Sequence, residues 1–205
     1  MKIELDRVSK RYRRDWILRR MTLELAPAGR YAVTGPNGSG KSTFLRLLSG
    51  HLSPTKGQVR YTLAGRPVPV TDVYQHLSYA APYIELIEEF TLEEALEFHR
   101  RFKPFLADLS IPDLIGLLGL EKARRLPIAY FSSGMKQRVK LALACCSASP
   151  LLLLDEPTTN LDAEGADWYR QLVERFATNR LVIVASNVPA DYQFCTEEIR
   201  ILDFK

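Results

Sequence analysis

The sequence predicts an α/β fold with a mostly parallel sheet, an N-terminal antiparallel β subdomain and an inserted α-helical subdomain. Continuous apolar runs are typical of strands buried on both faces of a parallel sheet, and they occur at Tyr31–Val33, Leu151–Leu154 and Leu181–Ala185. Apolar and polar residues alternate, as in half-exposed antiparallel strands, over 2–8, 17–25 and 58–63. Helical patterns dominate the stretch from 85 to 148.

Length and composition indicate one domain over residues 1–205. We expect the antiparallel β subdomain within about 1–70, the helical subdomain at about 85–148, and the α/β core from the remainder. Apolar residues make up 46% of the chain and charged residues 25%, as in ordinary globular proteins. No apolar run approaches the roughly 18 residues of a membrane span, and the first residues lack the apolar region of a signal peptide. These features predict a cytoplasmic protein that reaches the inner face of the cell membrane only through a partner.

Three of the predicted helices can be placed from local signals. The first, Thr43–His51, follows a glycine-rich loop. The second begins at Thr91 with a capping box to Glu94. Its buried face is expected to carry Leu92, Ala95, Leu96, His99 and Phe102, with His99 at the core edge rather than in a metal site. The third, Leu114–Leu118, ends at Gly119, and loops are expected at 103–112 and 126–133.

The C-terminal half adds two further helices and a last strand. Helices are predicted over Gly134–Ser147 and Asp162–Ala177, the latter with Trp168, Leu172 and Phe176 on its core face. Ile199–Leu202 is a candidate final strand. The three cysteines, Cys145, Cys146 and Cys195, lack metal-ligand spacing, and the adjacent pair Cys145 and Cys146 within an apolar helical pattern is predicted to be reduced and in the core.

The most informative motif is a glycine-rich loop between the first buried strand and the first predicted helix. It reads Gly35-Pro36-Asn37-Gly38-Ser39-Gly40-Lys41-Ser42-Thr43, the P-loop pattern. Gly35, Gly38 and Gly40 allow positive φ and a close approach of backbone N–H groups to phosphate oxygens. Lys41 supplies a positive charge for the outer phosphates, and Ser42 offers a hydroxyl to Mg²⁺. The loop predicts binding of a nucleoside triphosphate.

Two acidic residues follow the apolar run 151–154. Asp155 can hold Mg²⁺ through water opposite Ser42, and Glu156 is placed to polarise an attacking water. Taken alone, the segment has the alternative interpretation of a core strand followed by an acidic turn, but the P-loop upstream favours the catalytic interpretation.

The stretch Phe131–Arg138 precedes a predicted helix. Ser132 or Ser133 can cap that helix, and Gly134 allows a phosphate to approach the exposed N–H groups. Without further context, this stretch would be an ordinary capped helix.

Together, these motifs resemble the nucleotide-binding subunits of ATP-binding-cassette (ABC) transporters, including export-type and haem-exporter-like single cassettes. The resemblance covers essentially the whole chain and rests on Val8–Tyr12, Gly35–Thr43, Phe131–Gln137, Leu151–Pro157 and Asn160–Asp162. It implies that Tyr12 stacks on the adenine of ATP. It also implies that Gly35–Thr43 binds the phosphates, that Ser42 and Asp155 serve Mg²⁺, and that Glu156 is the catalytic base beside Lys41.

The resemblance further implies a composite site between two subunits. Ser132, Gly134 and Gln137 occupy signature positions that act on ATP held by a second ATPase subunit. Asp162 matches the aspartate of the loop that communicates across that interface. A single P-loop and a single signature then require head-to-tail pairing with another copy or a relative.

Three positions depart from the family pattern. The signature reads Phe131-Ser132-Ser133-Gly134-Met135 instead of Leu-Ser-Gly-Gly-Gln. Pro82 stands near where the family carries a glutamine, with Glu85 as the nearest polar residue, and Asn187 replaces the switch histidine. Asn187 can still hydrogen-bond a phosphate or water, although it carries no charge. We therefore expect a working but slower ATPase.

The resemblance implies a transmembrane permease as partner, docking near residues 79–100. The glutamates between Glu85 and Glu97 predict a basic docking helix on that partner. One alternative is a soluble ABC-type ATPase acting on nucleic acid or the ribosome, supported only by the basic segment 10–20, so we do not expect nucleic acid as a partner. Another is an ATP-gated interaction module with little turnover. Because the chain ends soon after the cassette, an exporter is preferred over an importer.

Overall fold

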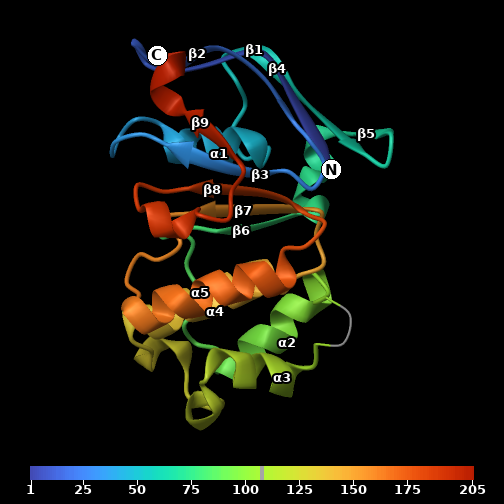
Figure 1. The fold of residues 1–205 in the computed structure, drawn as a ribbon. Coiled ribbons are helices and arrows are strands. Elements are labelled where there is room, and N and C mark those ends of the chain that lie inside the picture. The colour runs from blue at the N-terminus through green and yellow to red at the C-terminus, as the bar shows by residue number, and fades with distance from the viewer. Residues whose placement is uncertain (107–108) are drawn as a thin grey trace. The chain divides into compact units, whose positions relative to one another are not determined.

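The computed structural model describes residues 1–106 and 109–205 (Figure 1). The chain forms two compact units. The first comprises Met1–Tyr79, Ser149–Glu156 and Thr178–Lys205, and the second comprises Ala80–Ala148 and Pro157–Ala177. The expected helical subdomain at 85–148 thus omitted residues 157–177, which return to the second unit as its last helix.

A four-stranded antiparallel sheet, in the order β2-β1-β4-β5, forms one layer of the first unit (Figure 1). Its strands are β1 (Lys2–Tyr12), β2 (Asp15–Leu25), β4 (Lys56–Leu63) and β5 (Arg66–Val68). Ile3 pairs with Leu25 of β2 and with Tyr61 of β4, so the buried side chains of all three strands share one face. The alternation over 2–8, 17–25 and 58–63 predicted this sheet, although β5 carries no such signal.

The second sheet has the order β6-β7-β8-β3-β9. Its strands are β3 (Arg30–Thr34), β6 (Leu77–Ala80), β7 (Leu151–Asp155), β8 (Leu181–Ala185) and β9 (Glu197–Arg200). β8 lies between β7 and β3 and is parallel to both, and every residue of β7 and β8 is buried. The three continuous apolar runs therefore form the centre of a parallel sheet, as predicted.

Helix α1 (Lys41–Leu48) packs between the two sheets in Figure 1. Its buried side chains Phe44, Leu45, Leu47 and Leu48 join residues of β1, β2, β7 and β8 in one apolar core. This core fixes the loop before α1 at the carboxyl end of β3.

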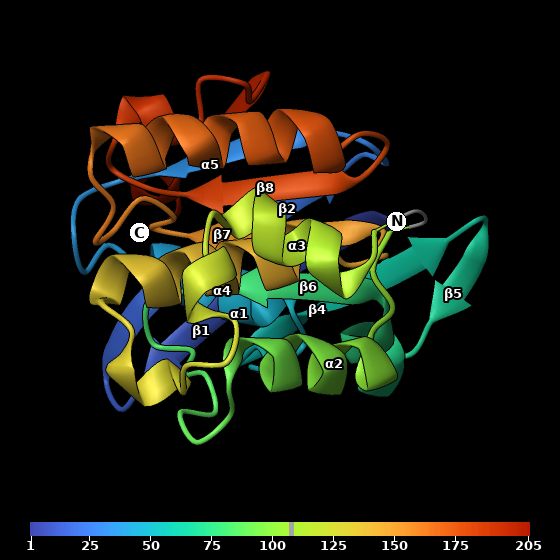
Figure 2. The same cartoon turned by 90° about the horizontal axis from the view of Figure 1, so that it is seen from below.

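The helices of the second unit are α2 (Leu92–Phe102), α3 (Ile111–Leu118), α4 (Ser133–Cys145) and α5 (Ala163–Phe176) (Figure 2). The capping box between Thr91 and Glu94 is present, as predicted. Gly119 ends α3 with a φ of 66°, also as predicted. Helix α3 begins three residues before the predicted Leu114, because Ser110 caps it and Pro112 is tolerated in a first turn. The loop predicted at 103–112 therefore ends by Ser110, and its residues 107–108 lie outside the described part.

Two further predictions were wrong. Phe102 does not share the buried face of α2, since 75% of its surface is exposed and it contacts Phe98 instead. The final strand is Glu197–Arg200 instead of 199–202, and Ile201–Phe204 forms a 3₁₀ helix.

Cys145 and Cys146 are buried and unoxidised, while burial raises the pKa of the half-buried Cys195 thiol to about 12. In the described residues, no helix is long and apolar enough to span a membrane.

Candidate nucleotide site

The glycine-rich loop connects β3 to α1, as its sequence predicts. Gly35, Gly38 and Gly40 have φ values of 145°, 74° and 108°, which other residues rarely adopt. Gly40 also lacks room for a side chain, because an added methyl group would lie 2.6 Å from Cγ2 of Ile17 in β2. The antiparallel sheet therefore packs directly against the loop.

The loop and its neighbours line a cavity of about 330 Å³. Its lining consists of the loop residues 37–43, Ile17 from β2 and Glu156 from the end of β7. Sequence reasoning missed Ile17, because its contact with Gly40 depends on how the two sheets pack. Tyr12, predicted to stack on adenine, ends β1 with 44% of its surface exposed and is not among the residues lining this cavity.

The Lys41 ammonium is the centre of the hydrogen-bonding network. Lys41 is only 5% exposed, so its charge is largely shielded from solvent. Its Nζ donates to the Gly35 carbonyl oxygen at 2.8 Å and to Asn187 Oδ1 at 3.0 Å. It also forms an ion pair with Glu156 Oε1 at 3.3 Å. The fold thus brings together the three residues predicted to carry catalysis.

Glu156 is held in an unusual backbone conformation. Its φ of 44° lies in the left-handed region, which costs a non-glycine residue about 1–2 kcal/mol. Its N–H donates to the Ala185 carbonyl at 2.7 Å, which anchors the turn after β7 to the end of β8. The strain is consistent with a turn that presents a carboxylate beside Lys41 instead of continuing the strand.

Ser186, a buried residue that sequence reasoning missed, also contacts Glu156. Its hydroxyl lies 3.3 Å from Glu156 Oε2 and 2.6 Å from the Asp191 carboxylate, and it accepts the Val188 N–H at 3.0 Å. The pattern Ala185-Ser186-Asn187 gave no indication that the serine points inward. This hydroxyl restrains the Glu156 side chain from the β8 end.

Asn187 connects the end of β8 to the loop itself. Its amide nitrogen donates to Asn37 Oδ1 at 2.6 Å, while its amide oxygen accepts from Lys41. Asn187 therefore links Asn37 near the start of the loop to Lys41 at its end. A charged histidine could not form both bonds, because both of its ring nitrogens are donors and neither can accept from Lys41.

Two oxygen-bearing residues are available for the predicted magnesium ion. Ser42 lines the cavity, and Asp155 is 1% exposed at the carboxyl end of β7, immediately before Glu156. Hydroxyl and carboxylate oxygens are the ligands Mg²⁺ prefers, commonly together with phosphate oxygens and water. The donor set therefore fits this ion.

The second unit contains its own cavity, of about 410 Å³. Ser132, Gly134 and Asp162 all line it, together with Asn160 and Arg138. Ser132 caps α4 by accepting the Met135 N–H at 3.2 Å, and Asp162 caps α5 by accepting the Gly165 N–H at 2.8 Å. The cavity is thus bounded by the N-termini of two helices, where backbone N–H groups favour anions.

Gln137 does not belong to this cavity. It is 2% exposed, and its amide donates to the Pro157 carbonyl at 2.7 Å within the second unit. The expectation that Gln137 acts directly on ATP of a second subunit is corrected accordingly, because the side chain fixes α4 to the segment that precedes α5. Arg138, which was not predicted, lines the cavity instead and lies over the Trp168 ring at 5.4 Å.

Comparison with known proteins agrees with this geometry. The model for the family described as "ABC transporter" matches residues 18–159. The lantibiotic transport ATP-binding protein SrtF of Streptococcus pyogenes is 30% identical to the chain, covering 90% of it and 79% of SrtF. The cytochrome c biogenesis ATP-binding export protein CcmA of Rhizobium etli is 32% identical, covering 92% of the chain and 89% of CcmA.

Among solved structures, a putative ABC transporter ATP-binding protein from Pyrococcus furiosus has the same fold. The TM-score is 0.82 at 21% identity, and the match covers 100% of both chains. The chain therefore belongs to the ABC transporter family, as one of its ATP-binding ATPase subunits.

Proposed function

We propose that this chain hydrolyses ATP with Mg²⁺ at the cavity beside the glycine-rich loop. The proposal is carried by the Lys41 ammonium, which joins Glu156, Asn187 and the loop backbone in one buried network. The loop N–H groups and Lys41 would bind the triphosphate, and Ser42 with Asp155 would hold Mg²⁺, which neutralises charge on the phosphates. Glu156 would orient and deprotonate the attacking water, with Asn187 beside the outer phosphate.

Phosphate release from the purified protein tests these roles. Glu156→Gln should slow release by about a hundredfold or more, because it removes the base but keeps the size of the side chain. The Asn187→Ala variant should turn over ATP more slowly than the wild type, since it lacks the side chain that links Lys41 to Asn37. Glu174→Gln is the matched control, because that glutamate is exposed on α5 and lines neither cavity. Equal rates for Glu156→Gln and the control would disprove the assignment of the base.

We also propose that Ser132 and Gly134 act on ATP held by a second ATPase subunit paired head-to-tail. Gly134 supports this, since an added methyl group would lie 3.1 Å from the Asn160 carbonyl and would displace the loop that leads to Asp162. Tyr12 would contact adenine from its exposed position at the end of β1. Gly134→Ala should abolish ATP-dependent dimerisation, measured by size exclusion with light scattering of the Glu156→Gln protein. Persistence of the dimer would exclude this role.

A membrane subunit is proposed to dock on the second unit near residues 79–100. This segment combines exposed apolar side chains, Tyr83, Ile87 and Phe98, with exposed acidic ones, Glu85 and Glu89. Glu88 is less suitable for attracting a basic partner, because it already forms an ion pair with Lys136. A relative named for lantibiotic transport supports a role in transport, and one named for cytochrome c biogenesis export supports an exporter.

Co-purification from native membranes tests the docking surface. The double variant Glu85→Lys/Glu89→Lys should lose the membrane subunit, whereas the control Glu121→Lys/Glu174→Lys changes the same charge elsewhere on the second unit and should retain it. Equal recovery of the membrane subunit with both variants would contradict the predicted surface.

A further inference from the structure

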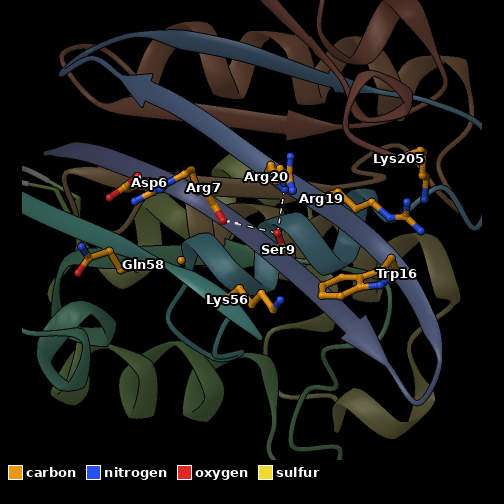
Figure 3. A pocket seen from close by; sticks show the side chains of 10 residues that line it. Asp6, Arg7, Ser9, Trp16, Arg19, Arg20, Lys56, Gln58 and Lys205 are labelled. Carbon is orange, nitrogen blue, oxygen red and sulfur yellow. Dashed lines mark hydrogen bonds and ion pairs between the residues drawn. The ribbon is translucent and has the colours of Figure 1, made fainter.

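A second, larger cavity of about 950 Å³ is hollowed into the antiparallel sheet of the first unit (Figure 3). None of the residues of the glycine-rich loop lines it. Five cationic side chains and one indole ring do, namely Arg7, Arg19, Arg20, Lys56, Lys205 and Trp16. The only carboxylate in the lining is that of Asp6. We call this hollow the basic pocket.

The backbone of the sheet is distorted where the basic pocket forms. Arg7 in β1 and Arg20 in β2 have φ values of 48° and 47°, and the pairing of β1 shifts register on both sides of Val8. Ser9, only 4% exposed, fixes the two distortions together, since its hydroxyl accepts the Arg20 N–H at 2.8 Å and reaches the Arg7 carbonyl at 3.5 Å. Bulges of this kind bend a sheet and redirect side chains.

A glycine on the third strand completes the hollow. Gly57 of β4 has a φ of 77°, and an added methyl group would lie 2.4 Å from the Asp6 carbonyl oxygen. β4 can therefore approach β1 closely at the bulge. The irregularities of β1, β2 and β4 thus occur at the same place and together form the basic pocket. A chance cluster of flexible side chains on a regular sheet would need no such irregularities.

The charges in the basic pocket are poorly balanced within the protein. Arg7 pairs with Asp6 at 3.3 Å, but no ion pair is recorded for Arg19, Arg20 or Lys56 in the described part of the chain. Lys205 is held in place by the carbonyl oxygens of Ile17, at 3.0 Å, and Ser39. In Figure 3, Arg19, Lys205 and Trp16 lie toward one end of the pocket and Asp6 and Arg7 toward the other.

We propose that the basic pocket binds a compact anion carrying several phosphate groups. Among the described residues, Arg19, Arg20 and Lys56 form no ion pair, and three such cations require more than a single negative charge to offset them. Guanidinium groups also match phosphate oxygens in a two-pronged geometry. The phosphates can belong to a free polyphosphorylated molecule or to the headgroup of an anionic lipid. The basic pocket shares no lining residue with the cavity beside the glycine-rich loop, although Lys205 also contacts Ile17 and Ser39 of that cavity.

A strand of nucleic acid fits the basic pocket less well. Sequence-tolerant binding of single strands needs aromatic faces on which successive bases stack. Trp16 is the only aromatic ring in the lining, and two cations already lie against it, Arg11 at 5.2 Å and Lys56 at 5.8 Å from the ring centre. The cations also converge on one hollow instead of following a groove across the surface.

Titration calorimetry with inositol hexakisphosphate tests the proposal on the full chain. The variant Arg19→Gln/Lys56→Gln should weaken binding of this probe by roughly tenfold or more, because each charge contributes about 1 kcal/mol at close range in water. The control Arg66→Gln/Lys122→Gln removes two exposed charges elsewhere and should retain the affinity, as should Lys41→Ala.

The source of the phosphates is distinguished by a second measurement. Flotation with vesicles containing phosphatidylinositol 4,5-bisphosphate should recover the wild type but not Arg19→Gln/Lys56→Gln if a lipid headgroup is the ligand, and neither protein if the ligand is a free molecule. No binding of the soluble probe, equal loss in the control, or loss in Lys41→Ala would overturn the proposal. Tighter binding of a single-stranded oligonucleotide that displaces the probe would also overturn it, in favour of a nucleic-acid surface.

Discussion

Replacing Gly57 by alanine should destabilise the antiparallel sheet far more than the same change at Gly65. Both glycines have nearly equal φ values, 77° and 78°, so both alanine variants pay the same backbone penalty of about 1–2 kcal/mol. Their surroundings differ. At Gly65 an added methyl group meets nothing within 4 Å, whereas at Gly57 it would lie 2.4 Å from the Asp6 carbonyl and 2.5 Å from the Arg7 carbonyl.

The difference between the variants follows from this contact. Both carbonyls belong to the backbone of β1, so they cannot move aside as a flexible side chain would. Forcing extra volume into such a site typically costs a further 1–3 kcal/mol or so. The gain from a less flexible unfolded chain, about 0.4–1 kcal/mol, is common to both variants and cancels. We therefore expect Gly57→Ala to be less stable than Gly65→Ala by about 1–3 kcal/mol.

Urea unfolding followed by tryptophan fluorescence measures the difference in the relevant unit. The chain has two tryptophans, and a Trp168→Phe background leaves Trp16, which lies in β2 beside the bulge. Unfolding midpoints that coincide for Gly57→Ala and Gly65→Ala would refute the close approach of β4 to β1. The same result would remove one support of the basic pocket.

Two further predictions concern buried polar groups. Burial, with a smaller effect from Lys103, lowers the pKa of His99 to about 4, so this group opposes folding as pH falls below its unfolded value of about 6.5. Between pH 7.5 and pH 5, urea unfolding should show that the wild type loses up to about 2 kcal/mol more stability than His99→Gln. Partial access of solvent to the ring reduces this difference. Equal losses of stability in the two proteins would contradict the lowered pKa. Ser186→Ala should lower kcat by about tenfold with little change in KM, because Glu156 loses a positioning hydrogen bond, while the exposed control Ser53→Ala keeps its kcat. A change confined to KM would argue against positioning of Glu156.

Helices, strands and loops that have a clear local sequence pattern could be predicted from the sequence. The buried runs gave the centre of the parallel sheet, the glycine-rich loop gave the junction of β3 and α1, and Thr91 with Glu94 gave the start of α2. Short strands such as β5 could not be found, because three residues contain too little periodicity. The exposure of Phe102 was missed since helical spacing continued to the last turn of α2, where Phe98 offers an alternative contact.

In the candidate site, too, the residues in sequence motifs could be predicted and those that depend on packing could not. Motif spacing placed Lys41 and Glu156 in one network, and chain order after β8 added Asn187. The contribution of Ile17 depends on the packing of one sheet against the loop, which no local pattern encodes. Gln137 was predicted to act on ATP of a second subunit because of its position in the signature, but its side chain is buried and its amide donates to the Pro157 carbonyl.

The surroundings of Lys41 bear on how a nucleotide enters its cavity. An ammonium has three N–H donors, and here three oxygens of the protein itself surround it, from Gly35, Asn187 and Glu156. A phosphate that reaches Lys41 must therefore exchange with one of them. The measured affinity is then the difference between two sets of bonds to the same cation. If the oxygen exchanged is that of Glu156, the displaced carboxylate is the one proposed to activate water, and arrival of the substrate and release of the base would be a single event.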